Sequence, residues 1–360
     1  MANTPEYAVG VWAAVAIAAG SIAAWLTGMV VGWASSRGIL DHPNSRSSHA
    51  RPTPRGGGLA IVAVTTIAAM IIAILLPSSG PQLAMLLLPA LAVAAISWRD
   101  DIRPLSTRTR LMVHVGAAAI AVGFFGPVER VDLGRFGMIE FGVLGWPLTM
   151  IWVVGLTNAF NFMDGIDGIA GITAAATGVA IALMFGAGGE TLVAMLPWSF
   201  AAAAVGFLSF NWSPARIFMG DVGSAFCGFL IAVLPLAFGR GEGLPLVLIT
   251  FLTLWPFIFD TGYTLIKRIA RRENVLEAHR GHLYQRLVIA GWSHRRVASL
   301  YGLLAAVGGG VAIAPLVVPA ARPVADAALF AFVLTVPAVL VGLVALVGQG
   351  YNPASQGLSR

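Results

Sequence analysis

Four polar segments of this sequence combine residue types that could do chemistry, and each borders an apolar stretch. The first holds the adjacent carboxylates Asp100 and Asp101. Neighbouring carboxylates repel one another, and near a membrane their desolvation is costly unless a cation lies beside them. Pairing with Arg99 and Arg103, as at an ordinary charged helix end, is the alternative interpretation. This segment alone does not decide between the two.

The second segment, 158–171, joins two apolar stretches and contains two acids but no basic residue. Its acids, Asp164 and Asp167, are three residues apart and share one face if the segment is helical. Three glycines at the same spacing allow a ligand or another backbone to approach closely. Helix packing would explain those glycines but not the carboxylates. A functional role is therefore favoured for the acids and for the neighbouring asparagines, Asn158 and Asn161.

The third segment, 211–224, begins with Asn211 and ends in Gly-Asp-Val-Gly-Ser at the start of an apolar stretch. Backbone N–H groups at a helix start bind anions, and the carboxylate of Asp221 beside them would suit a hard metal ion. The commoner role of an aspartate in this place is to cap the helix. We interpret Asp221 as a candidate metal ligand, with the capping role as the alternative.

The fourth segment begins at Asp260 and continues into a strongly basic stretch with two histidines. Asp260 lies deep in an otherwise apolar stretch, which makes it a functional candidate. His279 and His282 are three residues apart and would share a helix face. The guanidinium groups of Arg268 and Arg280 suit phosphate oxygens. A basic loop that binds lipid headgroups is the alternative, but it gives the histidines no role. The acids favour a hard cation over zinc.

The elements that must position these residues are membrane-spanning helices. Of the 360 residues, 58% are hydrophobic and only 11% are charged, and the mean hydropathy is +0.84. A soluble domain carries about 25% charged residues, so this chain has too few to cover a surface that faces water. A soluble core of buried helices would need polar helix faces, which the stretches 57–77 and 325–348 almost lack.

Apolar stretches long enough to cross a bilayer recur along the whole chain. The first lacks the basic flank of a signal peptide and is too long for one. The single cysteine, Cys227, excludes an internal disulfide. We expect an all-α, polytopic membrane bundle with 11 spans, at 7–34, 57–77, 81–98, 111–125, 143–160, 170–187, 191–209, 222–239, 244–266, 297–318 and 325–348.

The placement of basic residues predicts how the bundle is oriented. Most of the 22 Lys and Arg residues fall in the C-terminal tail and in the loops 35–56, 99–110, 210–221 and 267–296. The other loops hold only Arg130, Arg135, Arg240 and Arg322. By the positive-inside rule the first group is cytoplasmic, the N-terminus faces out and the C-terminus faces in. The basic excess therefore indicates topology and not a nucleic-acid partner.

The chain is expected to form one transmembrane domain, 1–360, without repeats. Its active face would consist of the four basic loops together with the loop 161–170. The segment 127–142 is expected to form a short hairpin on the outer face. A hard divalent ion held by carboxylates, with arginines around it, is the arrangement that phosphoryl transfer uses.

In order, spacing and membrane side, these segments resemble the polyprenyl-phosphate N-acetylhexosamine-1-phosphate transferases. This family includes the phospho-MurNAc-pentapeptide translocase of peptidoglycan synthesis. The resemblance covers nearly the whole chain, from the Pro-Thr-Pro-Arg-Gly-Gly motif at 52–57 to the histidine loop. The form His-Arg-x-His-x-Tyr-Gln-Arg at 279–286 is most similar to the bacterial O-antigen-initiating branch. It departs from the consecutive histidines of the peptidoglycan enzyme, which puts a pentapeptide substrate in doubt.

The resemblance implies a reaction in which undecaprenyl phosphate attacks the β-phosphorus of a UDP-N-acetylamino sugar. UMP leaves, and a lipid pyrophosphoryl sugar remains. The resemblance also implies Mg²⁺ as the cofactor, with Mn²⁺ as a substitute. It further implies a bacterial inner-membrane location with a cytoplasmic active site, contact with membrane lipids, and a homodimer.

The resemblance assigns roles to the acids residue by residue. Asp221 matches the Mg²⁺ ligand of the family. Asp100 and Asp101 match the acidic pair near the lipid phosphate, one of which is the proposed base or nucleophile. Asn161 and Asp164 match positions in the polar network of the active centre.

The remaining matches concern the nucleotide sugar. Asp167 and Phe218 match the positions that hold uracil and stack on it, while Asn211, His279 and His282 match further active-site positions. A phosphate monoester has a second pKa of about 6, so the lipid phosphate already carries most of its charge near neutral pH. Direct attack is therefore favoured over an aspartyl-phosphate intermediate.

Two other function classes remain open from the sequence. A cation-coupled transporter would also place acids in the membrane, but near the midplane of broken helices and often in two related halves. A CDP-alcohol phosphotransferase would need Ala-Arg after its Asp-Gly, and neither Asp164-Gly165 nor Asp167-Gly168 is followed by it. The sequence does not choose among UDP-N-acetylglucosamine and its deoxy or epimeric relatives.

Overall fold

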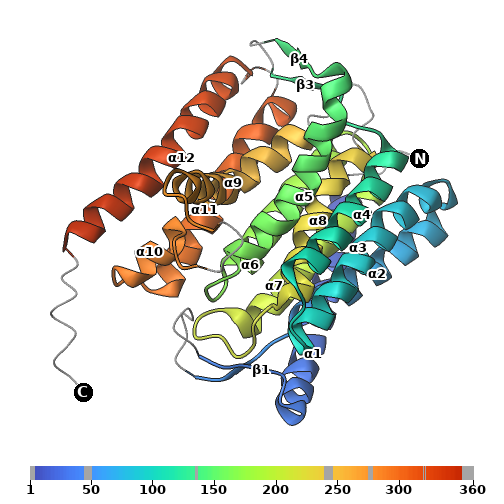
Figure 1. The fold of residues 1–360 in the computed structure, drawn as a ribbon. Helices are drawn as coiled ribbons and strands as arrows, with labels where there is room; N and C mark the ends of the chain where they lie inside the picture. The colour runs from blue at the N-terminus through green and yellow to red at the C-terminus, as the bar shows by residue number, and fades with distance from the viewer. Residues whose placement is uncertain are drawn as a thin grey trace, which may run out of the picture.

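The structure is a computed structural model, and it describes residues 5–43, 51–133, 137–238, 246–274, 279–318, 320 and 322–350. The described part is an all-α bundle with two small antiparallel hairpins (Figure 1). Short 3₁₀ turns cover Pro77–Ser79 and Gly142–Leu144. The first half contains α1 (Pro5–Arg37), β1 (Leu40–Asp41), β2 (Thr53–Pro54), α2 (Gly58–Leu75), α3 (Gly80–Ile102), α4 (Thr107–Phe125), β3 (Arg130–Asp132), β4 (Met138–Glu140) and α5 (Gly145–Met163). The second half contains α6 (Ile169–Ala187), α7 (Thr191–Asn211), α8 (Asp221–Phe238), α9 (Leu246–Ala270), α10 (Leu283–Ile289), α11 (His294–Val317) and α12 (Arg322–Gly350).

The expected membrane spans are confirmed. All described helices except the short α10 are long and apolar enough to cross a bilayer, which gives 11 candidate spans. The helix α3 continues to Ile102, beyond the expected end at 98, so Asp100 and Asp101 lie on its last turn. Part of the predicted active face, residues 44–50 and 275–278, lies outside the described residues.

The helix α8 forms the centre of the bundle. Of the apolar 18-residue stretch of α8 that could cross the membrane, 89% is buried inside the bundle. The corresponding share is 17% for α1 and 22% for α12, which lie at the periphery. Glycine makes the central packing close, because a Cβ added to Gly58 of α2 would overlap the Cα of Gly223 in α8. Small residues let membrane helices approach in this way. The start of α8 is thereby fixed against the start of α2.

The two ends of the bundle differ in structure. The β3–β4 hairpin, with Arg130 opposite Glu140, confirms the hairpin predicted within 127–142. It lies at the opposite end of the bundle from β1 and α10 (Figure 1). At the β1 end, Arg55 forms a parallel bridge with Phe218. Phe218 donates its N–H to Pro54 and accepts one from Gly57, at 2.8 and 2.9 Å. This pairing joins the start of α2 to the loop before α8.

Candidate active site

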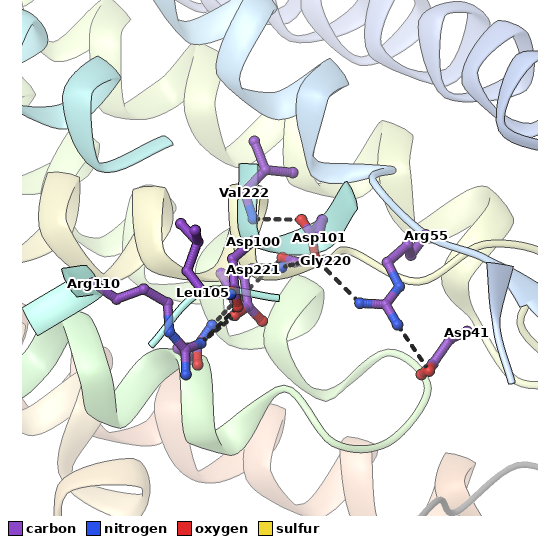
Figure 2. Close-up of polar contacts among 11 residues, drawn as sticks. Asp41, Arg55, Asp100, Asp101, Leu105, Arg110, Gly220, Asp221 and Val222 are labelled. Atoms are coloured by element: carbon purple, nitrogen blue, oxygen red, sulfur yellow. Dashed lines mark hydrogen bonds and ion pairs between the residues drawn. The ribbon is translucent and has the colours of Figure 1, made fainter. Parts of the chain in front are cut away.

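The carboxylate of Asp101 caps the start of α8. Its Oδ1 accepts the backbone N–H of Asp221 and its Oδ2 that of Val222, both at 3.0 Å (Figure 2). The first N–H groups of a helix lack partners within the helix, and an acid there also interacts favourably with the helix dipole. The alternative interpretation of Asp221 as the cap is therefore wrong. These two N–H groups, expected to bind an external anion, are occupied by Asp101.

Because Asp101 caps α8, the side chain of Asp221 is free to point elsewhere. Its Oδ2 lies 2.8 Å from Nη1 of Arg110, and the same nitrogen lies 2.9 Å from Oδ2 of Asp100 (Figure 2). The backbone N–H of Leu105 donates to the other oxygen of Asp100. Two carboxylates from α3 and α8 therefore converge on one guanidinium group from α4. The Asp221 side chain is 32% exposed, so the cluster is open to a ligand.

The acidic pair does not take its cations from the neighbouring sequence. Arg99 instead donates to the backbone carbonyl of Arg103, so the interpretation as an ordinary charged helix end is wrong. Asp101, whose side chain is only 2% exposed, has Nη1 of Arg55 at 3.7 Å. Arg55 also pairs with Asp41 at 3.1 Å. In the described residues the cations beside the pair are Arg110, at the start of the next helix α4, and Arg55, which precedes α2 (Figure 2).

A five-residue connection, 164–168, and not a helix carries the acids of the second segment. The helix α5 ends at Met163 and α6 begins at Ile169, so Asp164 and Asp167 do not share a helix face as the spacing suggested. Asn161, in the last turn of α5, donates to Ser224 Oγ at 3.0 Å. Burial raises the pKa of Asp164 well above its ordinary value, and the carboxylates of Asp221, Asp101 and Asp167 raise it further. Asp164 therefore belongs electrostatically to the acidic cluster.

Asp167 is held in its ionised form. Burial alone would raise its pKa, but hydrogen bonding and charge from the His294 ring, together with the backbone N–H of Ala215, lower the pKa below its ordinary value. His294 Nδ1 lies 3.3 Å from Oδ2 of Asp167, and Ala215 donates to the same oxygen at 3.1 Å.

Asn211 links the loop that carries Asp167 to the loop before α8. The residue after Asp167, Gly168, donates its N–H to the side-chain oxygen of Asn211. The amide of Asn211 in turn donates to the carbonyl of Ile217. Asn211 thus ties the loop 164–168 to the loop before α8.

The two histidines of the fourth segment precede α10 instead of lying on it. Their rings stack with centroids 4.9 Å apart, so the pair forms without the helix face that the spacing suggested. Burial, together with the neighbouring His282 and Arg268, lowers the pKa of His279 to about 4. His279 is therefore neutral near pH 7. Its Nδ1 accepts the N–H of Gly281 at 3.0 Å, so its proton lies on Nε2, which can donate to a phosphate oxygen.

The two candidate phosphate-binding arginines differ in position. Arg268 is buried, pairs with Glu273 at 3.0 Å and donates to the carbonyl of Asn274 at 2.6 Å. These contacts hold the end of α9 and the chain that follows it. Arg280 is half-buried and lies close enough to Tyr284 for its charge to act on that side chain. Arg280 is the better placed of the two for a ligand near the histidines.

The donor set of the acidic cluster fits a magnesium ion. Mg²⁺ usually takes one or two carboxylates, and water and substrate phosphates complete its octahedron. The oxygens of Asp100 and Asp221 that meet at Arg110 provide such a pair, whereas both oxygens of Asp101 are already used. Among the described residues no three His, Cys, Asp or Glu side chains could form a complete metal site by themselves. A magnesium ion here would therefore depend on the substrate for its remaining ligands.

Sequence reasoning missed two residues of the site, Arg110 and His294. Arg110 and His294 contact Asp100, Asp221 and Asp167, although the sequence separates each from at least one partner by more than 100 residues. Both fall in the predicted basic loops 99–110 and 267–296, just before a predicted span, where basic residues are expected for topology alone. Position alone therefore gave no signal. The missing information was which helix starts lie next to one another.

Comparisons with known proteins find a family model and several relatives that this chain resembles. The model of glycosyl transferase family 4 matches residues 83–239. A probable undecaprenyl-phosphate N-acetylglucosaminyl 1-phosphate transferase of Bacillus subtilis is 32% identical over 266 residues, which is 72% of this chain and 72% of that protein. The decaprenyl-phosphate N-acetylglucosaminephosphotransferase of Mycolicibacterium smegmatis is 32% identical over 322 residues, covering 78% of this chain and 77% of its own. An undecaprenyl-phosphate alpha-N-acetylglucosaminyl 1-phosphate transferase of Escherichia coli is 27% identical, with 75% and 74% covered.

Proposed function

Since the chain belongs to the polyprenyl-phosphate N-acetylhexosamine-1-phosphate transferases of glycosyl transferase family 4, we propose that it transfers an N-acetylamino-sugar 1-phosphate from a UDP-sugar to undecaprenyl phosphate. An oxygen of the lipid phosphate forms a bond to the β-phosphorus, and the bridge between the α- and β-phosphates breaks. The bridging oxygen leaves with UMP. The lipid pyrophosphoryl sugar would initiate O-antigen or another envelope glycan.

The observation that carries this proposal is the convergence of Asp100 and Asp221 on Arg110 at the start of the central helix. Asp221 and Asp100 would hold Mg²⁺, which when bound neutralises charge on the transferred phosphate. Arg110 supplies a fixed positive charge beside them. Asp101 holds the start of α8, and with it Asp221, in place.

The nucleotide sugar would lie across the loops that α8 and α11 position. Asp167, kept ionised by His294, would accept hydrogen bonds from uracil, and Phe218 would offer its ring for stacking. His279 Nε2–H and the charge of Arg280 would bind phosphate oxygens. The transfer itself then depends on alignment and charge neutralisation, as phosphoryl transfer generally does.

A panel of radiolabelled UDP-sugars tests the substrate assignment. The purified protein is supplied with undecaprenyl phosphate and Mg²⁺, and lipid-linked label is counted for UDP-N-acetylglucosamine and its deoxy and epimeric relatives. We expect one N-acetylamino sugar to be transferred well and UDP-glucose, which lacks the acetamido group, to be transferred poorly. Equal transfer of UDP-glucose would contradict an amino-sugar enzyme.

Phe218→Ala is expected to weaken binding of the nucleotide more than it slows the transfer step. In single-stranded nucleic-acid sites, replacing an aromatic side chain that stacks on a base by alanine costs about 1–3 kcal/mol of binding free energy, or about 5- to 150-fold in affinity. The backbone hydrogen bonds of Phe218 to Pro54 and Gly57 do not need the ring and should remain. Calorimetric titration with UDP measures the affinity, and single-turnover kinetics measure the rate. Unchanged UDP affinity would remove Phe218 from the uracil site.

The orientation of the bundle gives an independent prediction. We propose that the end with β1 and α10 faces the cytoplasm of a bacterial inner membrane, as the positive-inside rule favours. Cysteines at Thr107 and Ser293, both exposed, should be labelled in inverted but not in right-side-out vesicles. A cysteine at Met138, on β4, should behave in the opposite way. The natural Cys227 is buried and gives a low background. Labelling of Thr107 and Ser293 from different sides would contradict a single active face.

A further inference from the structure

The carboxylate of Asp260 lies inside the membrane-spanning helix α9 and has no exposed surface. It nevertheless accepts hydrogen bonds from residues of two other helices, α10 and α11. The backbone N–H groups of Leu283 and Tyr284, at the start of α10, donate to it at 2.8 and 3.0 Å. The hydroxyl of Tyr301 in α11 donates at 2.7 Å, and Nδ1 of His282 lies at 3.2 Å. Asp260 therefore joins α9, α10 and α11 at one point.

These contacts also fix the ring of His282. His282 Nδ1 lies 3.2 Å from Oδ1 of Asp260, and a carboxylate oxygen can only accept a hydrogen bond, so this contact forms when the imidazole carries a proton on Nδ1. A carboxylate that holds an imidazole in this way sets both its tautomer and its orientation. His282 in turn stacks on His279. The orientation of the histidine pair thus depends on Asp260.

The helix α10 is also pressed against the loop that carries Asp164. Tyr284 donates its hydroxyl to the carbonyl of Phe162 at 3.1 Å, at the end of α5. A Cβ added to Gly165 would overlap the Tyr284 hydroxyl, so the two segments are in direct contact. A displacement of α10 would therefore reach both the histidines and the acidic loop.

We propose that Asp260 is a positioning residue of the transferase, which holds α10 and the imidazole of His282 against the acidic loop. This inference rests on the proposed function, because it takes the histidine loop to be part of the active site. Asp260 binds in the same way as Asp101. In both cases a carboxylate on one long helix accepts the first backbone N–H groups of another helix. A buried charge in a span costs several kcal/mol. Apolar residues could have closed the bundle without that cost, which favours a functional reason for the carboxylate.

Hydrogen exchange tests the positioning without reference to activity. Asp260→Asn places an amide group against one of the two N–H donors of α10, so exchange across Leu283–Ile289 should accelerate about tenfold or more, the size expected for a lost bond to a charged group. Exchange in the central α8 should stay unchanged. The matched control is Thr261→Val, which removes only a hydroxyl that bonds within α9. Unchanged exchange in α10, or equal acceleration in α8, would overturn the proposal.

A milder variant keeps the test available if Asp260→Asn fails to accumulate. Tyr301→Phe removes one donor to the carboxylate and leaves the others in place. It should accelerate exchange in the same residues of α10, by less than Asp260→Asn. Acceleration confined to α11 would instead show that Tyr301 and Asp260 serve only helix packing and would overturn the proposal.

A double-mutant cycle connects the positioning to catalysis. Asp260→Asn should lower kcat about tenfold or more and change the KM for the UDP-sugar little, because the site is displaced but the uracil contacts remain. In a His282→Ala background the same substitution should cost much less, since residues that act through one another are not additive. Full additivity would overturn the proposal. If the unmodified protein does not transfer the sugar phosphate at all, the proposed function itself would be contradicted.

Discussion

Asp221→Asn is expected to abolish sugar-phosphate transfer while the protein remains folded. The asparagine keeps the size of the side chain and the backbone N–H that Asp101 accepts, so α8 should stay capped. It removes the negative charge that would hold Mg²⁺ beside Asp100. A metal supplies several kcal/mol of charge stabilisation in the transition state, which corresponds to about a hundredfold or more in rate.

The measurement is transfer rate across a magnesium titration, with thermal stability recorded for each sample. The control is Asp326→Asn, which neutralises an acid on the peripheral helix α12 and should leave the rate unchanged. Removing divalent ions from the unmodified enzyme should reproduce the defect, and added Mg²⁺ should restore the rate. Near-normal activity of Asp221→Asn at any magnesium concentration would remove Asp221 from the metal site.

The adjacent acids Asp100 and Asp101 are expected to fail in different ways when each is changed to asparagine. Asp100 contacts Arg110 and the backbone of Leu105, so Asp100→Asn should lower the single-turnover rate about 10- to 100-fold with little loss of stability. Asp101 is buried and accepts two N–H groups of α8. An amide there turns an NH₂ group towards one of them, so Asp101→Asn should also lower the stability, by about 2 kcal/mol.

Single-turnover rates and thermal unfolding in detergent distinguish the two variants. The expected pattern is a slow but stable Asp100→Asn and a slow, destabilised Asp101→Asn. Equal unfolding temperatures would contradict the capping role of Asp101. Full single-turnover rates in both variants would show that the acidic pair takes no part in the reaction.

Much of the fold could be predicted because a bilayer imposes simple requirements on sequence. A span needs about 20 apolar residues, and each of the expected spans is present in the structure with boundaries shifted by a few residues. The limits of the prediction lie where polar segments meet the bundle. The helix α3 continues through Asp100 and Asp101, whereas the chain between α5 and α6 leaves the helix at Asp164. Hydropathy alone does not separate these two outcomes.

The sequence singled out candidate residues for the site but did not predict their contacts. The acids and histidines stand out because ionisable groups near a membrane need partners. Which partners they take is decided by packing. Asp101 binds the backbone of α8 and Asp260 that of α10, so two acids that the sequence marked as functional candidates also hold helix starts in place. The cation between Asp100 and Asp221 is Arg110, which the sequence presented as one of several topological arginines.

The central claim is that a phosphosugar, and not the sugar alone, moves to the lipid. The most direct test uses UDP-N-acetylglucosamine labelled with ³²P in the β-phosphate, or the equivalent form of the sugar that the panel selects, with undecaprenyl phosphate and Mg²⁺. Our account predicts that the label enters the lipid fraction and that one UMP is released for each lipid product. Label that remains in the aqueous phase as UDP while the sugar enters the lipid would contradict it.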